Sequence, residues 1–285
     1  MEADPLAPWM LAVKLGLYAS ALLAAGLVLQ ASLGIVEREG RARVLRSAAL
    51  LSWVALIFAG LRLAITSMQL GGSIESIYDA DTLAWTWPAL APSTTAIVAG
   101  VVGLNAAWLS RAVLPAAPAA VAIAASFALT GHSQALETPG LAPWGVGAHV
   151  LIAAFWFAAP ITLWPGPALS DDALTRRAER FTQYALFAIP ILFALGLWLA
   201  WLLAGGVDAL LTRLYGQLLL AKLTAATAVL ALGAYNKQVV TRKLREMPDV
   251  GRRALAVTLT LDGLLFAAAL VLVGVATTLT GPPTN

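Results

Sequence analysis

Hydrophobic residues follow one another in long uncharged stretches, separated by short segments that hold most of the charged residues. A helix needs about 20 apolar residues to cross a bilayer core of about 30 Å. The pattern predicts eight membrane spans, over residues 8–35, 44–70, 92–111, 115–131, 143–164, 180–204, 214–237 and 252–279. We therefore expect an all-α, polytopic membrane helical bundle, formed by residues 1–285 as a single integral-membrane domain.

Two kinds of segment modify this picture of eight regular spans. Pro160 and Pro190 fall inside predicted spans, where proline removes a backbone hydrogen bond and is expected to kink the helix. The longest connection expected on the outer side runs from Gly71 to Pro92. Its last residues, TWPALAP, indicate an ordered cap more than a flexible tether.

The composition supports a membrane protein. Of the 285 residues, 60% are hydrophobic and 12% are charged, whereas about 25% of the residues in a soluble domain are charged. The mean hydropathy is +0.82. Cysteine is absent, so the chain has no thiolate ligand and no disulfide.

The basic residues set the expected orientation. The connections on one side hold 14 of the 18 Lys and Arg residues: Arg38, Arg41, Arg43, Arg46, Arg111, Arg176, Arg177, Arg180, Lys237, Arg242, Lys243, Arg245, Arg252 and Arg253. By the positive-inside rule this side is cytoplasmic, and both termini are extracytoplasmic. The rule also accounts for the net charge of +3. We therefore expect the lipid bilayer as the partner of this chain, and no nucleic acid.

Four charged residues fall within predicted spans, where each costs at least about 2.5–3.5 kcal/mol to insert. At about 1.5 Å per residue, Lys14 lies about 9 Å deep from the outer side, and Arg62 and Lys222 about 12 Å deep. Asp262 falls near the midplane, and its depth predicts an ion pair with Lys222. Lys14 and Arg62 have no acid at their depth, so they must reach the outer surface, face a wet cavity or lie beside a bound anion.

The only two histidines fall in the outer part of the predicted bundle. His132 ends one span, and His149 lies about two turns into the next. Met68 lies near the outer end of its span, and imidazole with thioether suits Cu(I) better than zinc. These residues are candidate copper ligands. The alternatives remain open that the histidines only form hydrogen bonds between helices and that Met68 is an ordinary apolar residue.

Several motifs resemble the copper resistance protein D family. They are TGH at 130–132, the spacing from His149 to Trp156, and the block YGQLLLAKLTAATAVLALGAYN at 215–236, followed by basic residues and an acid in the last span. The resemblance is clearest over residues 130–283. It implies an inner-membrane copper protein in which His132, His149, Lys222 and Asn236 occupy family positions.

This chain departs from the family pattern at the last-span acid, which is usually glutamate and here is Asp262. It also lacks an outer loop rich in histidine or methionine. A high-capacity copper store is therefore not expected.

The hypothesis from sequence is a multi-pass protein of the bacterial inner membrane that transports or handles copper and is not an enzyme. A periplasmic copper-binding protein is the expected partner. Two other functions remain open: a membrane redox protein that binds b-type haem through the histidines, and an assembly partner of a copper enzyme that does not itself transport. Against haem, the histidines are about 17 residues apart across one short loop, which favours side-by-side imidazoles over ligands on opposite faces of a porphyrin.

Overall fold

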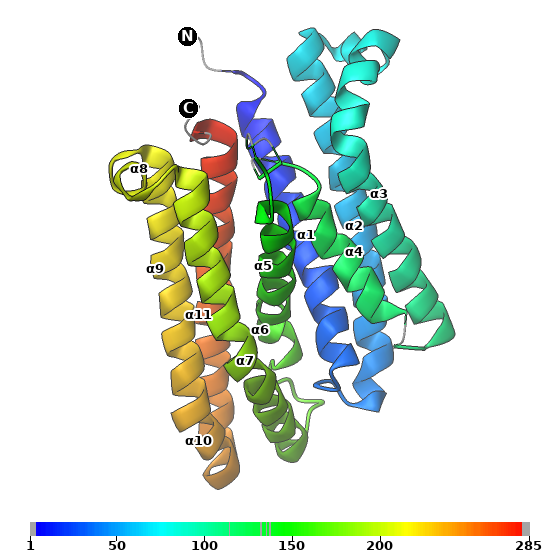
Figure 1. Cartoon of the computed structure of the whole chain (residues 1–285). Coiled ribbons are helices and arrows are strands. Elements are labelled where there is room, and N and C mark those ends of the chain that lie inside the picture. The colour runs from blue at the N-terminus through cyan, green and yellow to red at the C-terminus, as the bar shows by residue number, and fades with distance from the viewer. Residues whose placement is uncertain (1–3, 114, 132, 135, 137, 281–285) are drawn as a thin grey trace.

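We describe a computed structural model of the chain, in which residues 4–113, 115–131, 133–134, 136 and 138–280 are described. These residues form helices and short connections, with no strand among them. The helices run up and down in one bundle (Figure 1). The all-α class expected from the sequence is confirmed.

The bundle has two distinct ends. At the upper end in Figure 1, α1 begins and the last helical segment finishes, so the described chain starts and stops on the same side. The opposite end, here called the basic end, carries the connections rich in Arg and Lys. The helical elements are α1 (Ala7–Ser32), α2 (Arg38–Gly71), η1 (Ile74–Ile77), α3 (Ala80–Ser110), α4 (Ala116–Ala128), α5 (Ala142–Phe157), α6 (Ala159–Thr162), α7 (Asp171–Ala204), α8 (Val207–Thr212), α9 (Leu214–Tyr235), η2 (Asn236–Val240), α10 (Thr241–Glu246), α11 (Pro248–Val275) and η3 (Ala276–Thr280).

Among the described residues, seven helical stretches are long and apolar enough to cross a membrane. They are α1, α2, α3, the α5–α6 pair, α7, the stretch Leu214–Glu246 and the stretch Pro248–Thr280. The remaining predicted span, 115–131, corresponds to α4, which has only 13 residues and a length of about 20 Å. Seven of the eight predicted spans are therefore long helices, and the count of eight is not confirmed, because the short helix α4 only carries the chain back toward the upper end before α5 (Figure 1).

Helix α3 begins much earlier than the sequence predicted. Its first residue is Ala80 instead of a residue near Pro92, and both Pro88 and Pro92 lie inside it. Asp79 caps the helix, since its carboxylate accepts hydrogen bonds from the hydroxyl and the backbone N–H of Thr82, the latter at 2.8 Å. These bonds hold the pKa of Asp79 below its usual value. The prediction of a long connection from Gly71 to Pro92 is therefore wrong, because Asp79 caps a helix that begins within this segment.

Ion pairs join the helices at the basic end. Arg177 of α7 lies 2.6 Å from Glu37, the residue before α2. Arg252 of α11 lies 2.5 Å from Asp171 at the start of α7. Helices α2 and α7 therefore begin earlier than their predicted apolar spans, because polar turns extend them into this layer of paired charges.

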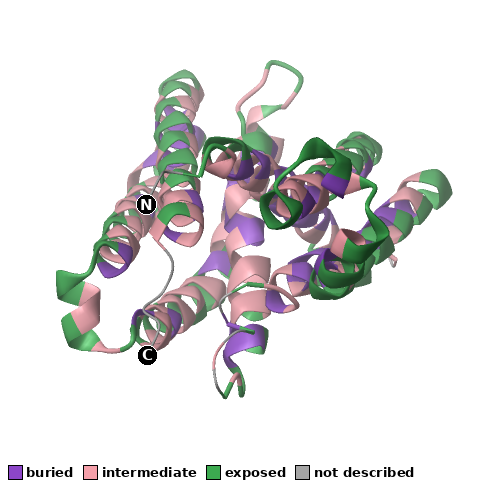
Figure 2. Cartoon of the chain, turned by 90° about the horizontal axis from the view of Figure 1, so that it is seen from above, coloured by how far each residue is buried: buried purple, intermediate pink, exposed green. Residues whose placement is uncertain are grey.

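Helix α1 is the central element of the bundle. In its most apolar stretch 56% of residues are buried, against 6% in both α7 and Leu214–Glu246. Exposed residues accordingly gather on the peripheral helices and the connections (Figure 2). Gly26 brings α1 directly against α5, since a Cβ at this position would lie 1.9 Å from the carbonyl oxygen of Ala154. Close contact through a small residue is typical of membrane helix pairs.

A buried polar contact fixes the same pair of helices. Gln30 of α1 is fully buried, and its amide donates to the carbonyl of Phe155 at 2.6 Å. The hydroxyl of Thr162 donates to the Gln30 side-chain oxygen. The chain between these two partners breaks at Ala158, where α5 ends and α6 begins with Pro160 in its first turn. The kink expected at Pro160 is thus a helix break, whereas α7 continues through Pro190.

Candidate functional site

A cavity of about 450 Å³ lies in the upper half of the bundle and is here called the upper cavity. Residues from α1, α2, α4, α5, α7, α9 and α11 line it, most of them apolar. Its basic lining residues are Lys14, Arg62, His149 and Lys222. The cavity therefore brings together four of the candidate residues that the sequence placed on four different spans.

His149 enters this cavity from α5. Its Nδ1 atom is buried and has no hydrogen-bond partner among the described residues, while the ring also interacts with the backbone of Leu192 on α7. Gly196, one turn further along α7, leaves room for the ring, because a Cβ there would lie 3.2 Å from Cε1. A buried ring nitrogen without a partner is a position that a bound ligand would satisfy.

The other two candidate ligands have different positions. His132 lies outside the described residues, but Thr130, Gly131 and Ser133 line the upper cavity. Met68 is partly buried near the end of α2 and is not among the described residues that line this cavity. The structure therefore does not bring Met68 and His149 together in one cavity.

Lys14 and Arg62 meet only neutral partners in the upper cavity. The Lys14 ammonium donates to the carbonyl of Thr277 at 3.0 Å, and Arg62 Nη2 donates to the hydroxyl of Thr130 at 2.9 Å. No Asp or Glu is among the described residues that line the cavity. The sequence allowed three surroundings for these cations, namely the outer surface, a cavity or a bound anion, and the structure shows that both line a cavity.

The prediction of an ion pair between Lys222 and Asp262 is wrong. No ion pair within the described part of the chain includes either residue. Lys222 lines the upper cavity, whereas Asp262 lines a separate pocket beside Gly233. Lys222 and Gly233 are eleven positions apart on α9, or about 17 Å along the helix axis. Counting depth from the predicted span ends placed the two charges on one level, but the continuous helical stretches Leu214–Glu246 and Pro248–Thr280 extend beyond those spans at the basic end.

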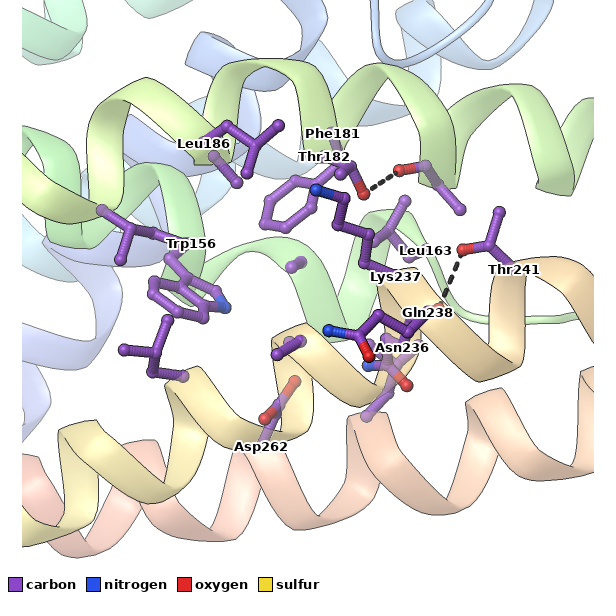
Figure 3. Close-up of a pocket in the computed structure, with 18 residues that line it drawn as sticks. Trp156, Leu163, Phe181, Thr182, Leu186, Asn236, Lys237, Gln238, Thr241 and Asp262 are labelled. Atoms are coloured by element: carbon purple, nitrogen blue, oxygen red, sulfur yellow. Dashed lines mark hydrogen bonds between the residues drawn. The ribbon is translucent and has the colours of Figure 1, made fainter.

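The pocket that contains Asp262 has a volume of about 210 Å³ and is here called the lower pocket. It lies between α5–α6, α7, the α9–η2 junction and α11. Figure 3 shows Asp262, Asn236, Lys237 and Trp156 around it. Asp262 is 2% exposed, and one oxygen each of Asp262 and Asn236 is buried without a hydrogen-bond partner in the described part of the chain. Asn236 begins a π-helical segment, a distortion that is frequent at functional sites.

Trp156 separates the two hollows. Among the described residues, it is the only one that lines both the upper cavity and the lower pocket. The indole is buried, packs edge-on against Phe266 with ring centroids 6.3 Å apart, and lies where a Cβ on Gly233 would come within 3.2 Å of it. The sequence motifs included Trp156 only through its spacing from His149 and did not include Gly196 or Gly233, since a lone glycine in an apolar span carries no positional signal.

Within the described residues, no group of three or more His, Cys, Asp or Glu side chains is arranged to hold a metal ion. A tetrahedral zinc site built from such residues is therefore not seen there. The chemistry that the upper cavity offers is a single described imidazole in apolar surroundings, with ammonium and guanidinium groups on its wall.

Comparison with known proteins gives one result. Residues 175–276 match the family model of copper resistance protein D. No curated protein and no solved structure matches the chain. The matched segment holds nearly all of α7 and the whole of α9 and α11, with Lys222, Asn236 and Asp262, whereas His132 and His149 precede it. Over residues 175–276, the match confirms the resemblance to the copper resistance protein D family that the sequence motifs indicated.

Proposed function

We propose that this protein handles copper at the membrane by binding it in the upper cavity, with His149 as a ligand and His132 as the second imidazole. The observation that carries the proposal is the buried, unpartnered Nδ1 of His149 in a cavity that residues on both sides of position 132 also line. The family match supports copper as the metal.

The ligand set favours Cu(I) in this proposal. Imidazole binds copper, zinc, iron and nickel, but zinc sites usually add carboxylate or thiolate ligands. The described lining of the upper cavity includes no carboxylate and no methionine. Cu(I) accepts a site of few ligands, so two imidazoles suffice for it.

Binding and delivery fit the geometry better than conduction of free copper ions. Lys14, Arg62 and Lys222 all line the upper cavity and oppose the entry of a bare cation. Below Trp156, the described wall of the lower pocket contains no His or Met. Oxygen ligands such as those of Asp262 and Asn236 suit harder ions than Cu(I).

The setting we propose is the bacterial inner membrane, with the upper end outside. The upper end carries acidic residues, and a copper ion or a partner protein would first meet the bundle there. These residues are Asp4, Glu75, Asp79, Asp81 and Asp208. A periplasmic copper-binding protein is the partner that this arrangement suits. The protein has no catalytic role in this proposal.

The test is copper binding by the purified protein in competition with a chromophoric Cu(I) chelator. We expect one tightly bound Cu(I) in the unmodified protein and none in His149→Ala or in the double variant with His132→Ala. Met68→Leu is the matched control, since Met68 does not line the upper cavity, and it should retain the copper. Unchanged copper stoichiometry in the double variant would refute the site.

A second candidate, b-type haem, is favoured by the size and lining of the upper cavity. A volume of about 450 Å³ with mainly apolar walls exceeds what one metal ion needs and falls in the range of cofactor pockets, about 300–1,000 Å³. His149 would supply an axial ligand, and Lys14 and Arg62 would take the propionates; haem would supply one-electron transfer. A Soret band in the purified protein that is lost in His149→Ala would support haem, and a colourless protein that binds Cu(I) would exclude it.

A further inference from the structure

The upper cavity carries more positive charge than its protein surroundings balance. Lys14, Arg62 and Lys222 come from three different helices and line the same space. Every ion pair among the described residues lies at the basic end, and none includes these three cations. The three charges are therefore held in the membrane region without a carboxylate.

Burial of such charges is costly unless something compensates them. Insertion of one Lys or Arg near the middle of a membrane helix is unfavourable, and such residues are usually paired or face a water-filled cavity. The contacts of Lys14 and Arg62 are a neutral carbonyl and a neutral hydroxyl, which satisfy donors but do not offset charge. Lys14 also lies close enough to Arg62 for their charges to repel each other. A compensating anion would remove this repulsion and replace part of the lost hydration.

The remaining wall of the upper cavity is apolar. Leu192, Phe193 and Leu197 of α7 face it, and Leu219, Leu223, Leu265 and Phe266 extend the apolar wall along α9 and α11. A small inorganic anion would leave this wall uncovered. The combination of fixed cations with an apolar wall is complementary to a molecule that has an acidic group and a hydrocarbon body.

We propose that the upper cavity is a binding site for an amphiphilic anion, whose acidic group lies between Lys14 and Arg62 and whose apolar body lies against α7, α9 and α11. Lys222 adds a second positive position beside His149, since its charge acts on the imidazole. This site goes beyond copper binding and stands on the geometry of the cavity alone. The same chemistry has two sources, a free carboxylate amphiphile and an anionic phospholipid of the bilayer.

The experiment compares three ligands that share one tail. Radiolabelled dodecanoate, dodecanol and dodecyltrimethylammonium are titrated against the full-length, metal-free protein in nanodiscs of phosphatidylcholine, with empty nanodiscs as the background. We expect saturable binding of one dodecanoate per protein, at least tenfold tighter than either of the other ligands. Equal binding of all three ligands would overturn the proposal without any variant.

Variants then assign the binding to the cations. The triple variant Lys14→Gln, Arg62→Gln, Lys222→Gln should bind dodecanoate at least tenfold more weakly and keep its weak binding of dodecanol, which shows that the cavity is intact. Arg213→Gln is the control, because Arg213 is exposed at the upper end and does not line the cavity. Loss of affinity in this control equal to that in the triple variant would contradict the site.

The source of the anion is identified by varying the lipid composition of the nanodisc. If dodecanoate binding falls when phosphatidylglycerol replaces part of the phosphatidylcholine, the lipid headgroup occupies the site. Undiminished binding assigns the site to a free amphiphile. Because no copper is present, failure of this experiment leaves the copper proposal untouched, and the absence of copper binding leaves this one untouched.

Discussion

At the scale of single residues, the position of the His149 ring depends on a glycine of another helix. Gly196 of α7 faces the Cε1–Nδ1 edge of the imidazole. A side chain at this position has to displace the ring or push α7 outward. The geometry of the candidate ligand is thus set partly by an absent side chain.

Gly196→Val is therefore expected to weaken copper binding, because its Cγ atoms reach further into the ring than the Cβ position at 3.2 Å. We expect a loss of at least threefold in Cu(I) affinity, measured by chelator competition. Gly263→Val on α11 is the matched control, since nothing lies within 4 Å of a Cβ there. An equal loss in both variants would mean that the effect is one of helix stability and not of the site.

The separation of Lys222 from Asp262 also makes a residue-scale prediction. Residues that line different hollows and share no partner are expected to act independently, within about 0.5 kcal/mol. In a thermal-unfolding cycle of Lys222→Met, Asp262→Asn and the double variant, we expect additive changes. A coupling energy above about 1 kcal/mol would indicate a direct interaction between the two residues and contradict their separation.

At the scale of elements, the contact between α1 and α5 fixes how the two halves of the bundle meet. Helices α1 to α5 share one apolar core, and α5 to α11 share a second. Gly26 and Gln30 of α1 hold α5 and α6 by close backbone contact and by buried hydrogen bonds. Since α5 also carries His149 and Trp156, this contact places both hollows relative to α1.

Gly26→Ala should destabilise the protein, because its Cβ would lie 1.9 Å from a backbone oxygen that only a shift of α5 can remove. Overpacking of this kind costs about 1–3 kcal/mol, so the midpoint of thermal unfolding should fall. Gly60→Ala on α2 is the control: nothing lies within 4 Å of its Cβ, and higher helix propensity should leave it neutral or slightly more stable. A wild-type midpoint for Gly26→Ala would contradict the close α1–α5 packing.

The elements also show what the sequence determines and what it does not. The apolar runs predicted the class and nearly every long helix, because length and hydropathy are local properties. Asp79 started α3 early, and polar turns extended α2 and α7, because caps and ion pairs act outside the apolar runs. Lys14, Arg62, Lys222 and His149 were identified one by one as notable, but that they share one cavity depends on helix rotation and packing, which the hydrophobic pattern does not encode.

At the scale of the whole molecule, the two ends of the bundle differ in charge. The basic end holds the ion pairs and most Lys and Arg residues, and the upper end holds acidic connections. With an even number of passages through the bundle, the first and last described helices begin and end together at the upper end (Figure 1). By the positive-inside rule, we expect the upper end to lie at the outer face.

Single cysteines test this orientation directly, because the natural chain has none. Asp208→Cys lies on the exposed part of α8, and Arg242→Cys lies at the basic end. A membrane-impermeant maleimide applied to intact spheroplasts should label position 208 and not position 242, and permeabilised membranes should label both. The reverse pattern would invert the bundle and place the upper cavity on the cytoplasmic side.

The central claim is that copper is held by imidazole in the upper cavity, and X-ray absorption at the copper edge of the Cu(I)-loaded protein tests it most directly. We expect the multiple-scattering signature of imidazole ligands in the unmodified protein and its reduction or loss in His149→Ala. A copper environment without imidazole, or one that is identical in the two proteins, would contradict it.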